Sequence, residues 1–363
     1  MLPVYPILSL LAAWGLSVFW QRFQGKKRLI PAIVSVIVLG GTLTWAKTFV
    51  DTIYGQPHTR VEAVEWIYDS IPAMIQLEGS VEGTSETAKI IPSAPAALTI
   101  SASAPYEGTF QVNNNTLINL IRLPHASNQA TVDSLLLIEL LDPADQILSQ
   151  TEIILKANGG DQALNLTLPS AYLTAGTGYR IRLSVPLGSD LTLRRNVLAN
   201  ENWDEGLPFP YQGYDPFGQL YTGITNEVRW SDSESKKEML LNTLDQADYI
   251  MLPSQRSIWS AVRIPLSYPM TIDYYNALFD GSLGFELVKM AQRPFQFGSL
   301  YFSDLTGELR WGTAPELPVK NLSVWAAEEA FSVYDHPPVW IFKKTADFDL
   351  AAAKTVLDRA DLS

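Results

Sequence analysis

The first fifty residues contain no aspartate or glutamate and form two long apolar stretches, residues 2–20 and 29–50. A helix needs about 20 apolar residues to cross the roughly 30 Å hydrocarbon core of a bilayer, because it rises about 1.5 Å per residue. Only helices and closed barrels satisfy every backbone hydrogen bond inside lipid. We therefore expect residues 1–50 to form two transmembrane helices.

The alternative is a cleaved signal peptide, whose basic residues precede a short apolar region. In this chain four basic residues, at 22 and 26–28, follow the first apolar stretch, and a second, longer stretch comes after them. This order favours two helices. Positively charged loops stay in the cytoplasm, so we expect the loop 21–28 to be cytoplasmic. The protein is then a multi-pass protein of the cell membrane, with residues 51–363 on its exterior face.

The exterior region is strongly acidic. The chain has 26 basic and 38 acidic residues, and five basic and no acidic residues lie in the first fifty. The remainder therefore carries 21 basic and 38 acidic residues, a net charge of −17. Such a surface repels nucleic acid and anionic lipid, so no nucleic-acid partner is expected. The chain has no cysteine, which excludes disulfides and thiol chemistry.

Residues 51–95 are expected to contribute a helix, a strand and a linker. Residues 58–68 have helical periodicity. Residues 73–77 suit a strand, and residues 79–95 are rich in Gly, Ser, Thr, Glu and Pro, as linkers are. The apolar residues on the expected helix face are Val61, Val64, Ile67 and Tyr68.

Residues 96–230 suit a β-sandwich of the jelly-roll or immunoglobulin-like kind. Short stretches that favour strands recur at regular spacing, and turn signals such as residues 142–145 separate them. Apolar and polar side chains alternate in the clearest strand, residues 178–185. Its apolar side chains are Tyr179, Ile181, Leu183 and Val185.

Residues 231–363 mix helices and strands, which suggests a small α/β layer. We expect the helix and strand of residues 51–95 to belong to this layer, so that the sandwich is an insertion into an α/β domain. The fold class is thus a membrane-anchored α+β fold. Expected helices lie at 236–244, 270–279 and 346–360, and expected strands at 248–252, 285–290 and 339–343.

The residues give little support for catalysis, a cofactor or a metal. His58, His125 and His336 are far apart in the sequence and no cysteine accompanies them, so a transition-metal site is not expected. Residues 200–206 are acidic, but they lack the ordered spacing of a calcium loop and suit a solvated loop. The chain has no Gly-x-Ser-x-Gly elbow and no phosphate-binding glycine loop. No catalytic residue is therefore predicted.

The most unusual segment is residues 203–217, which combine aromatic residues, Gly and Pro with carboxylates. Aromatic faces stack on the CH groups of sugars while carboxylates accept hydroxyl protons, so this loop suits a glycan. Alternatively, its aromatic residues cover the seam between the sandwich and the α/β part. Residues 334–338 suit either a site or a turn into the last strand. The candidate binding residues are Trp203, Asp204, Tyr211, Tyr214, Asp215, Arg256 and His336.

Several phrases along the chain resemble a group of bacterial and archaeal polytopic membrane proteins. They include Leu-Pro-Val-Tyr-Pro at 2–6, Trp-Asp-Glu-Gly-Leu-Pro at 203–208 and Gly-Tyr-Asp-Pro-Phe-Gly at 213–218. Others lie at 59–60, 66–67, 244–250, 268–271, 283–288 and 327–337. Through these phrases the chain resembles the "YYY" membrane-protein domain family and the related family 39 glycosyltransferases, which look like dolichyl-phosphate-mannose protein mannosyltransferases.

The resemblance implies the C-terminal portion of a larger polytopic protein. In such families further membrane helices come first, and the catalytic acidic residues lie in an upstream exterior loop, so none is carried over to this chain. The expected function is the exterior C-terminal domain and membrane anchor of a glycosyltransferase-like protein that uses lipid-linked sugar, without catalysis of its own.

The alternatives are a membrane-tethered module that binds a cell-surface glycan or a protein, and a structural subunit of a separate catalytic membrane chain. The expected partners are the lipid bilayer, a lipid-linked sugar or cell-surface glycan, and either the missing N-terminal part or a catalytic membrane subunit.

Overall fold

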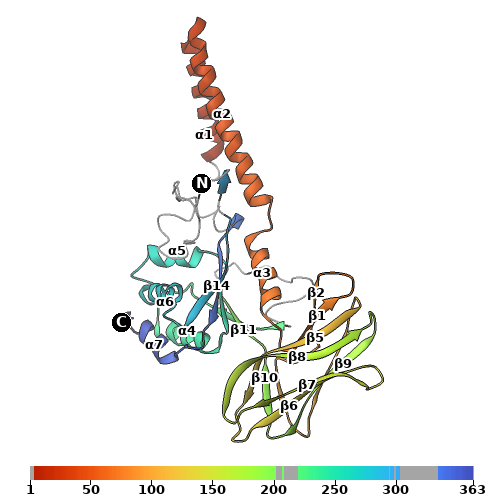
Figure 1. Cartoon of the computed structure of the whole chain (residues 1–363). Coiled ribbons are helices and arrows are strands. Elements are labelled where there is room, and N and C mark those ends of the chain that lie inside the picture. The colour runs from red at the N-terminus through yellow and green to blue at the C-terminus, as the bar shows by residue number, and fades with distance from the viewer. Residues whose placement is uncertain are drawn as a thin grey trace.

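The protein has a mixed α+β fold, seen in a computed structural model that describes residues 4–201, 207, 220–293, 295–297, 300–302 and 334–362. A helical stalk leads to two β-rich parts (Figure 1). The stalk consists of α1 (Val4–Arg22), η1 (Gly25–Arg28), α2 (Leu29–Phe49) and the short π-helix η2 (Val50–Tyr54). It is followed by α3 (Thr59–Ser70), which enters the body of the molecule.

The stalk contains one long apolar helix. Within the described residues, one helical run, Gly25–Ser70, includes a stretch long and apolar enough to cross a membrane. Only 6% of that stretch is buried inside the molecule, so its apolar side chains do not serve a protein core. A helix of this kind near the N-terminus is either a membrane anchor or a signal sequence.

Two antiparallel sheets pack face to face in the sandwich part, because apolar residues alternate along their strands and fill one shared core. One sheet has the order β2-β1-β5-β10-β3, with β8 also paired to β5, and the other has the order β4-β9-β6-β7. The predicted inward residues of β9 are all buried. The strands are β1 (Gln76–Val81), β2 (Thr87–Ile90), β3 (Ala97–Ile100), β4 (Tyr106–Gln111), β5 (Thr116–Asn128), β6 (Ser134–Leu141), β7 (Ile147–Leu155), β8 (Gly159–Leu173), β9 (Gly178–Leu187) and β10 (Leu191–Arg194).

The α/β part is built on a five-stranded sheet with the order β12-β11-β13-β17-β14. β11 runs parallel to both of its neighbours, β12 and β13, whereas β17 is antiparallel to β13 and to β14. A separate small hairpin pairs β15 (Phe295–Phe297) with β16 (Leu300–Phe302). The sheet strands are β11 (Val197–Glu201), β12 (Thr222–Asn226), β13 (Tyr249–Leu252), β14 (Phe285–Ala291) and β17 (Val339–Lys344).

Helices cover both faces of this sheet, so its central strands are apolar on both sides. Tyr249 and Met251 of β13 pack against α3, while Ile250 and Leu252 point to the opposite face. The helices on that opposite face are α4 (Glu234–Gln246), α5 (Arg256–Arg263), α6 (Pro269–Phe279) and α7 (Leu350–Leu357). The predicted helices and buried strands of residues 231–363 are thereby confirmed, apart from shifts at their ends.

Both expected ends of the sandwich, at residues 96 and 230, are wrong. The strand expected in the α/β layer at 73–77 is β1, and it pairs with β5 of the sandwich because Leu77 fills the sandwich core. The expected linker 79–95 contains β2, which pairs with β1. At the other end, β11 and β12 belong to the α/β sheet, so the sandwich does not extend to residue 230. Leu198 and Ala199 are both buried, as a strand covered on two faces requires.

Candidate functional site

Three parallel strands end at one edge of the α/β sheet. β12 lies on one side of β11 and β13 lies on the other, so the chain passes across β11 between them. In open α/β sheets, ligands bind outside the carboxyl ends of the strands at such a reversal of strand order. The residues at these ends are Asn200 and Glu201 of β11, Asn226 of β12 and, just after β13, Gln255. We call this the carboxyl edge.

Glu201 is the central acid of the carboxyl edge. It is buried, and the Tyr275 hydroxyl of α6 donates a hydrogen bond of 2.9 Å to its Oε2 atom. Burial raises the pKa of Glu201 to about 8, although that hydrogen bond and the charge of Lys236 oppose the shift. A carboxyl group with such a pKa keeps its proton near neutral pH, so it can donate as well as accept a hydrogen bond.

Further buried polar atoms at this edge make no hydrogen bond to the described residues. They are Oε1 of Glu201, Oδ1 of Asn200, Oδ1 of Asn226, and both Oε1 and Nε2 of Gln255. Glu201 and Asn226 are cross-strand neighbours, and Gln255 is fully buried at the start of α5. Asn200 points to the opposite face of the sheet from Glu201, because successive strand residues alternate. Buried polar groups in proteins are nearly always paired, so unpaired ones at one edge of a sheet mark a place where a ligand or water binds.

The carboxyl edge is fastened to the chain segment that leaves the stalk. The His58 ring Nε2 lies 3.1 Å from the carbonyl oxygen of Tyr334, and the Thr59 hydroxyl donates to the carbonyl of Pro337 at 2.5 Å. The Arg60 Nε donates to the carbonyl of Pro253 at 3.1 Å. Residues 334–338 precede β17 and residue 253 follows β13, and these two strands are antiparallel neighbours. The end of the stalk therefore lies at the same edge as Glu201 and Gln255.

Two of the sequence-predicted site residues lie at this edge. Arg256 begins α5, and its Nη1 donates to the Tyr334 hydroxyl at 3.2 Å. His336 is buried, with its ring 6.4 Å from the ring of Phe49 at the end of α2. The other five, Trp203, Asp204, Tyr211, Tyr214 and Asp215, lie outside the described residues.

Sequence reasoning missed Glu201, Asn226, Gln255 and Tyr275. Asn200 and Glu201 were expected in a solvated loop, which is wrong because both are buried at the end of β11. The usable signal was the apolar run at 197–199, which indicates a buried strand whose last residues are polar. Strand order could not be read from the sequence, so nothing indicated that Asn226 ends up beside Glu201 or that Gln255 follows the strand on the other side of β11.

A second polar cluster joins the sandwich to the α/β part. Asp161 accepts a hydrogen bond from His125 Nδ1 at 2.7 Å, and Arg194 donates to Asp161 at 2.6 Å and to Asp248 at 2.6 Å. The cluster lines a cavity of about 670 Å³. The charged groups of the cluster pair with one another, and Asp248 also accepts a hydrogen bond from the backbone N–H of Val197 at 2.8 Å. This arrangement is that of a structural clamp, and we name it the junction clamp.

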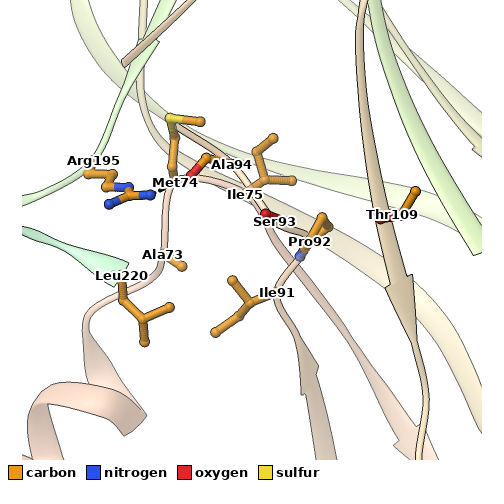
Figure 2. A pocket seen from close by; sticks show the side chains of 10 residues that line it. All are labelled: Ala73, Met74, Ile75, Ile91, Pro92, Ser93, Ala94, Thr109, Arg195 and Leu220. Carbon is orange, nitrogen blue, oxygen red and sulfur yellow. Dashed lines mark hydrogen bonds between the residues drawn. The ribbon is translucent and has the colours of Figure 1, made fainter. Parts of the chain in front are cut away.

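A smaller cavity of about 490 Å³ lies where the chain passes from α3 into the sandwich. Figure 2 shows Arg195 turned toward Met74 and Ala94, with Leu220 and Ile91 below them in the view. Arg195 donates to the carbonyl of Ala94, and burial lowers the pKa of its guanidinium. The described lining contains no acid and no histidine, so it offers no acid–base pair. Within the described residues, no group of three His, Cys, Asp or Glu is placed to hold a metal ion.

Comparisons with known proteins leave the family open. No family model and no curated protein matches the chain. The solved structures that it resembles include an arabinose-bound GH51 α-L-arabinofuranosidase, with a TM-score of 0.18, 11% identity, and coverage of 34% of this chain and 26% of that chain. The tailspike protein 4 of bacteriophage CBA120 matches with a TM-score of 0.18, 12% identity, and coverage of 34% and 17%.

A glycosylation-associated protein complex, Gap123, from Streptococcus agalactiae matches with a TM-score of 0.17 and 13% identity, over 54% of this chain and 76% of that chain. This chain thus spans less than a third of the arabinofuranosidase and of the tailspike. At TM-scores this low, none of the three carries an argument about the fold or the function of this chain.

Proposed function

We propose that this chain is the exterior domain and membrane anchor of a glycosyltransferase-like membrane protein that uses lipid-linked sugar. Its role is to bind the saccharide head group at the carboxyl edge, without catalysis of its own. The observation that carries this proposal is that unpaired buried polar groups lie at the same edge of the sheet as residues 58–60, where the stalk ends. A ligand held there has its polar part in the protein and its lipid part within reach of the bilayer.

The anchor in this proposal is the pair α1 and α2, with the loop 21–28 in the cytoplasm. The indole N–H of Trp20 in α1 donates to the hydroxyl of Ser35 in α2 at 2.9 Å, which links the two helices. Apolar side chains around both helices are exposed, and such surfaces are stable in lipid and not in water. These side chains include Leu10, Trp14, Val36, Ile37 and Leu43.

The chemistry of the carboxyl edge favours a neutral, hydroxyl-rich ligand. Gln255 supplies an unpaired amide that both donates and accepts, Asn226 supplies its Oδ1 as an acceptor while its Nδ2 donates to the Tyr274 hydroxyl, and a protonated Glu201 supplies a carboxylic acid, all without net charge. Sugar hydroxyls need this combination of donors and acceptors. Arg256 at the same edge supplies a cation that suits the phosphate of a lipid-linked sugar. The family resemblance points to the same ligand class.

The test is binding of a polyprenyl-phosphate hexose to the full chain in lipid nanodiscs, measured by crosslinking from a photoreactive group on the sugar. Gln255→Leu and Asn226→Leu are expected to weaken binding about tenfold each, because each removes one or two hydrogen bonds of about 1 kcal/mol. Gln150→Leu makes the same chemical change at an exposed position of β7 and should not alter binding.

Unchanged binding by the two edge variants would overturn the site. Equal binding of the free saccharide without its lipid would favour the alternative, a membrane-tethered glycan-binding module.

A further inference from the structure

Three large apolar side chains are exposed together on the α/β part. Leu266 is 97% exposed, Trp230 is 62% exposed and Ile264 is 51% exposed. Two hydrogen bonds hold their segments side by side: Asp232 N–H donates to the Ser267 carbonyl at 2.9 Å, and the Tyr268 hydroxyl donates to the Arg229 carbonyl at 2.8 Å. We call Trp230 with residues 264–266 the apolar tip. Apolar groups gathered in this way on a surface mark a contact site.

The directions of the strands place the apolar tip on the side of the carboxyl edge. Trp230 follows β12, which ends at that edge with Asn226. Residues 264–268 lead into α6, which returns the chain to Phe285, the start of β14. Phe285 pairs with Lys344, the last residue of β17, so it lies at the opposite edge. Both segments of the tip therefore lie on the stalk side, and Figure 1 shows α5 on that side of the α/β part.

Cationic side chains accompany the apolar ones. The Arg229 guanidinium lies 4.8 Å from the centre of the Trp230 ring, and the Arg263 guanidinium lies 5.3 Å from the ring of Trp259. Trp and Arg are typical of the zone between lipid head groups and acyl chains, where an apolar body and a polar end are both satisfied. Arg229 also pairs with Glu227, with 3.2 Å between Nε and Oε2, and the region as a whole carries a net charge of −17.

We propose that the apolar tip inserts into the head-group zone of the same bilayer that holds the stalk. The exterior domain is then held to the membrane at two separate points, and the carboxyl edge lies against the lipid surface. This inference rests on the proposed membrane anchor. The acidic charge of the rest of the domain opposes anionic lipid, so apolar insertion drives the contact and zwitterionic lipid is sufficient.

The chain has no cysteine, so single-cysteine variants of the full chain can carry one fluorophore each. The variants are Leu266→Cys at the tip, Val36→Cys in the middle of α2, and Ile154→Cys on β7 of the sandwich, which is 56% exposed. Each is labelled with an environment-sensitive dye in phosphatidylcholine nanodiscs. We expect spin-labelled lipids to quench the dye at 266 and at 36, and not at 154. Quenching by lipid separates insertion from burial in a second protein.

The outcomes separate the two proposals. If lipid quenches the dye at 36 but not at 266, the anchor stands and the tip proposal is overturned. If lipid quenches neither, the membrane anchor itself is wrong. A third outcome is that the dye at 266 is shielded from water but not quenched by lipid. If this shielding occurs only in discs that hold two chains, the tip binds a second copy of the chain instead of the bilayer.

A second measurement uses the strength of insertion. Ile264→Ser in the Leu266→Cys background is expected to lower the ratio of inserted to free tip roughly tenfold, which corresponds to about 1.4 kcal/mol. Leu187→Ser is the matched control, because Leu187 is 68% exposed on the sandwich. The control should leave lipid quenching at 266 unchanged, and an equal loss with both variants would contradict insertion at the tip.

Discussion

His125 of the sandwich and Asp248 of the α/β part meet across the junction clamp, with 3.3 Å between the ring Nε2 and the carboxylate Oδ2. Burial alone would lower the pKa of His125, but hydrogen bonds to Asp161 and Asp248 outweigh it and raise that pKa to about 9. Burial alone would raise the pKa of Asp248, but His125 and Arg194 hold it well below its usual range. The two parts are thus joined by charges that depend on pH.

The first prediction is a loss of stability on the alkaline side. The pKa of His125 is higher in the folded than in the unfolded state, so its contribution is complete below pH about 6.5 and disappears as the pH rises through about 9. The size is on the order of 3 kcal/mol. Thermal unfolding of the wild type followed from pH 6 to pH 10 should show this decline, and His125→Gln should show a smaller one, because it keeps only the fall below pH about 8 that Glu201 causes.

The acid side of the same cluster has the opposite sign. The pKa of Asp248 is lower in the folded state, so its contribution is present above its usual pKa and is lost as the pH falls below it. The clamp is therefore strongest between mildly acidic and neutral pH. A wild-type unfolding curve that is flat from pH 6 to pH 10 would show that His125 is not charged in the folded protein.

The second prediction concerns the buried carboxyl of Glu201. As the pH rises, this carboxyl loses its proton in the unfolded state before it does in the folded state, because its pKa is raised by folding. The stability of the folded state therefore falls progressively from pH about 4.5 to about 8. Glu201→Gln keeps the shape without this penalty. The variant should gain on the order of 4 kcal/mol relative to the wild type between pH 5 and pH 8. Glu86→Gln, at an exposed position, should show no such trend in the same unfolding series.

The third prediction tests how firmly the stalk is fastened. Thr59 is buried, and Thr59→Val removes the hydroxyl that bonds to the Pro337 carbonyl. The carbonyl is then left buried without this partner, which costs about 1–3 kcal/mol. Hydrogen exchange should become faster along α3 and at the start of β17. Thr355→Val removes a comparable hydroxyl from an exposed turn of α7 and should change little. Equal effects of both variants would argue against the fastening.

The local sequence pattern predicted those strands in which the buried residues follow a regular spacing. The alternation in β9 and the apolar stretches of β13 and β17 identify their strands because side-chain direction repeats within each element. The pattern did not predict which sheet a short strand joins, because its hydrogen-bonded neighbour decides this. β1 and β11 are both short, and only their pairing shows that the first belongs to the sandwich and the second to the α/β sheet.

The candidate site was harder to predict than the fold. Glu201, Asn226 and Gln255 lie far apart in the sequence, and the order of the parallel strands brings them to one edge. Arg256 and His336 were predicted and lie at that edge, whereas the aromatic loop with Trp203 and Tyr214 lies outside the described residues and stays a prediction. The first of the two expected transmembrane helices, residues 2–20, also stays a prediction, because Gly25–Ser70 is the single helical run that meets the requirements for a span in the part described.

The route of the chain through its two parts sets an order of assembly. The sandwich closes with strands from residues 76–194, so it can fold while later residues are still being synthesised. α3 comes before it but must wait for β17, since Thr59 finds its partner 278 residues further along. A nascent chain released after residue 194 would therefore carry a finished sandwich on a stalk that is not yet docked, and the carboxyl edge would still be unformed.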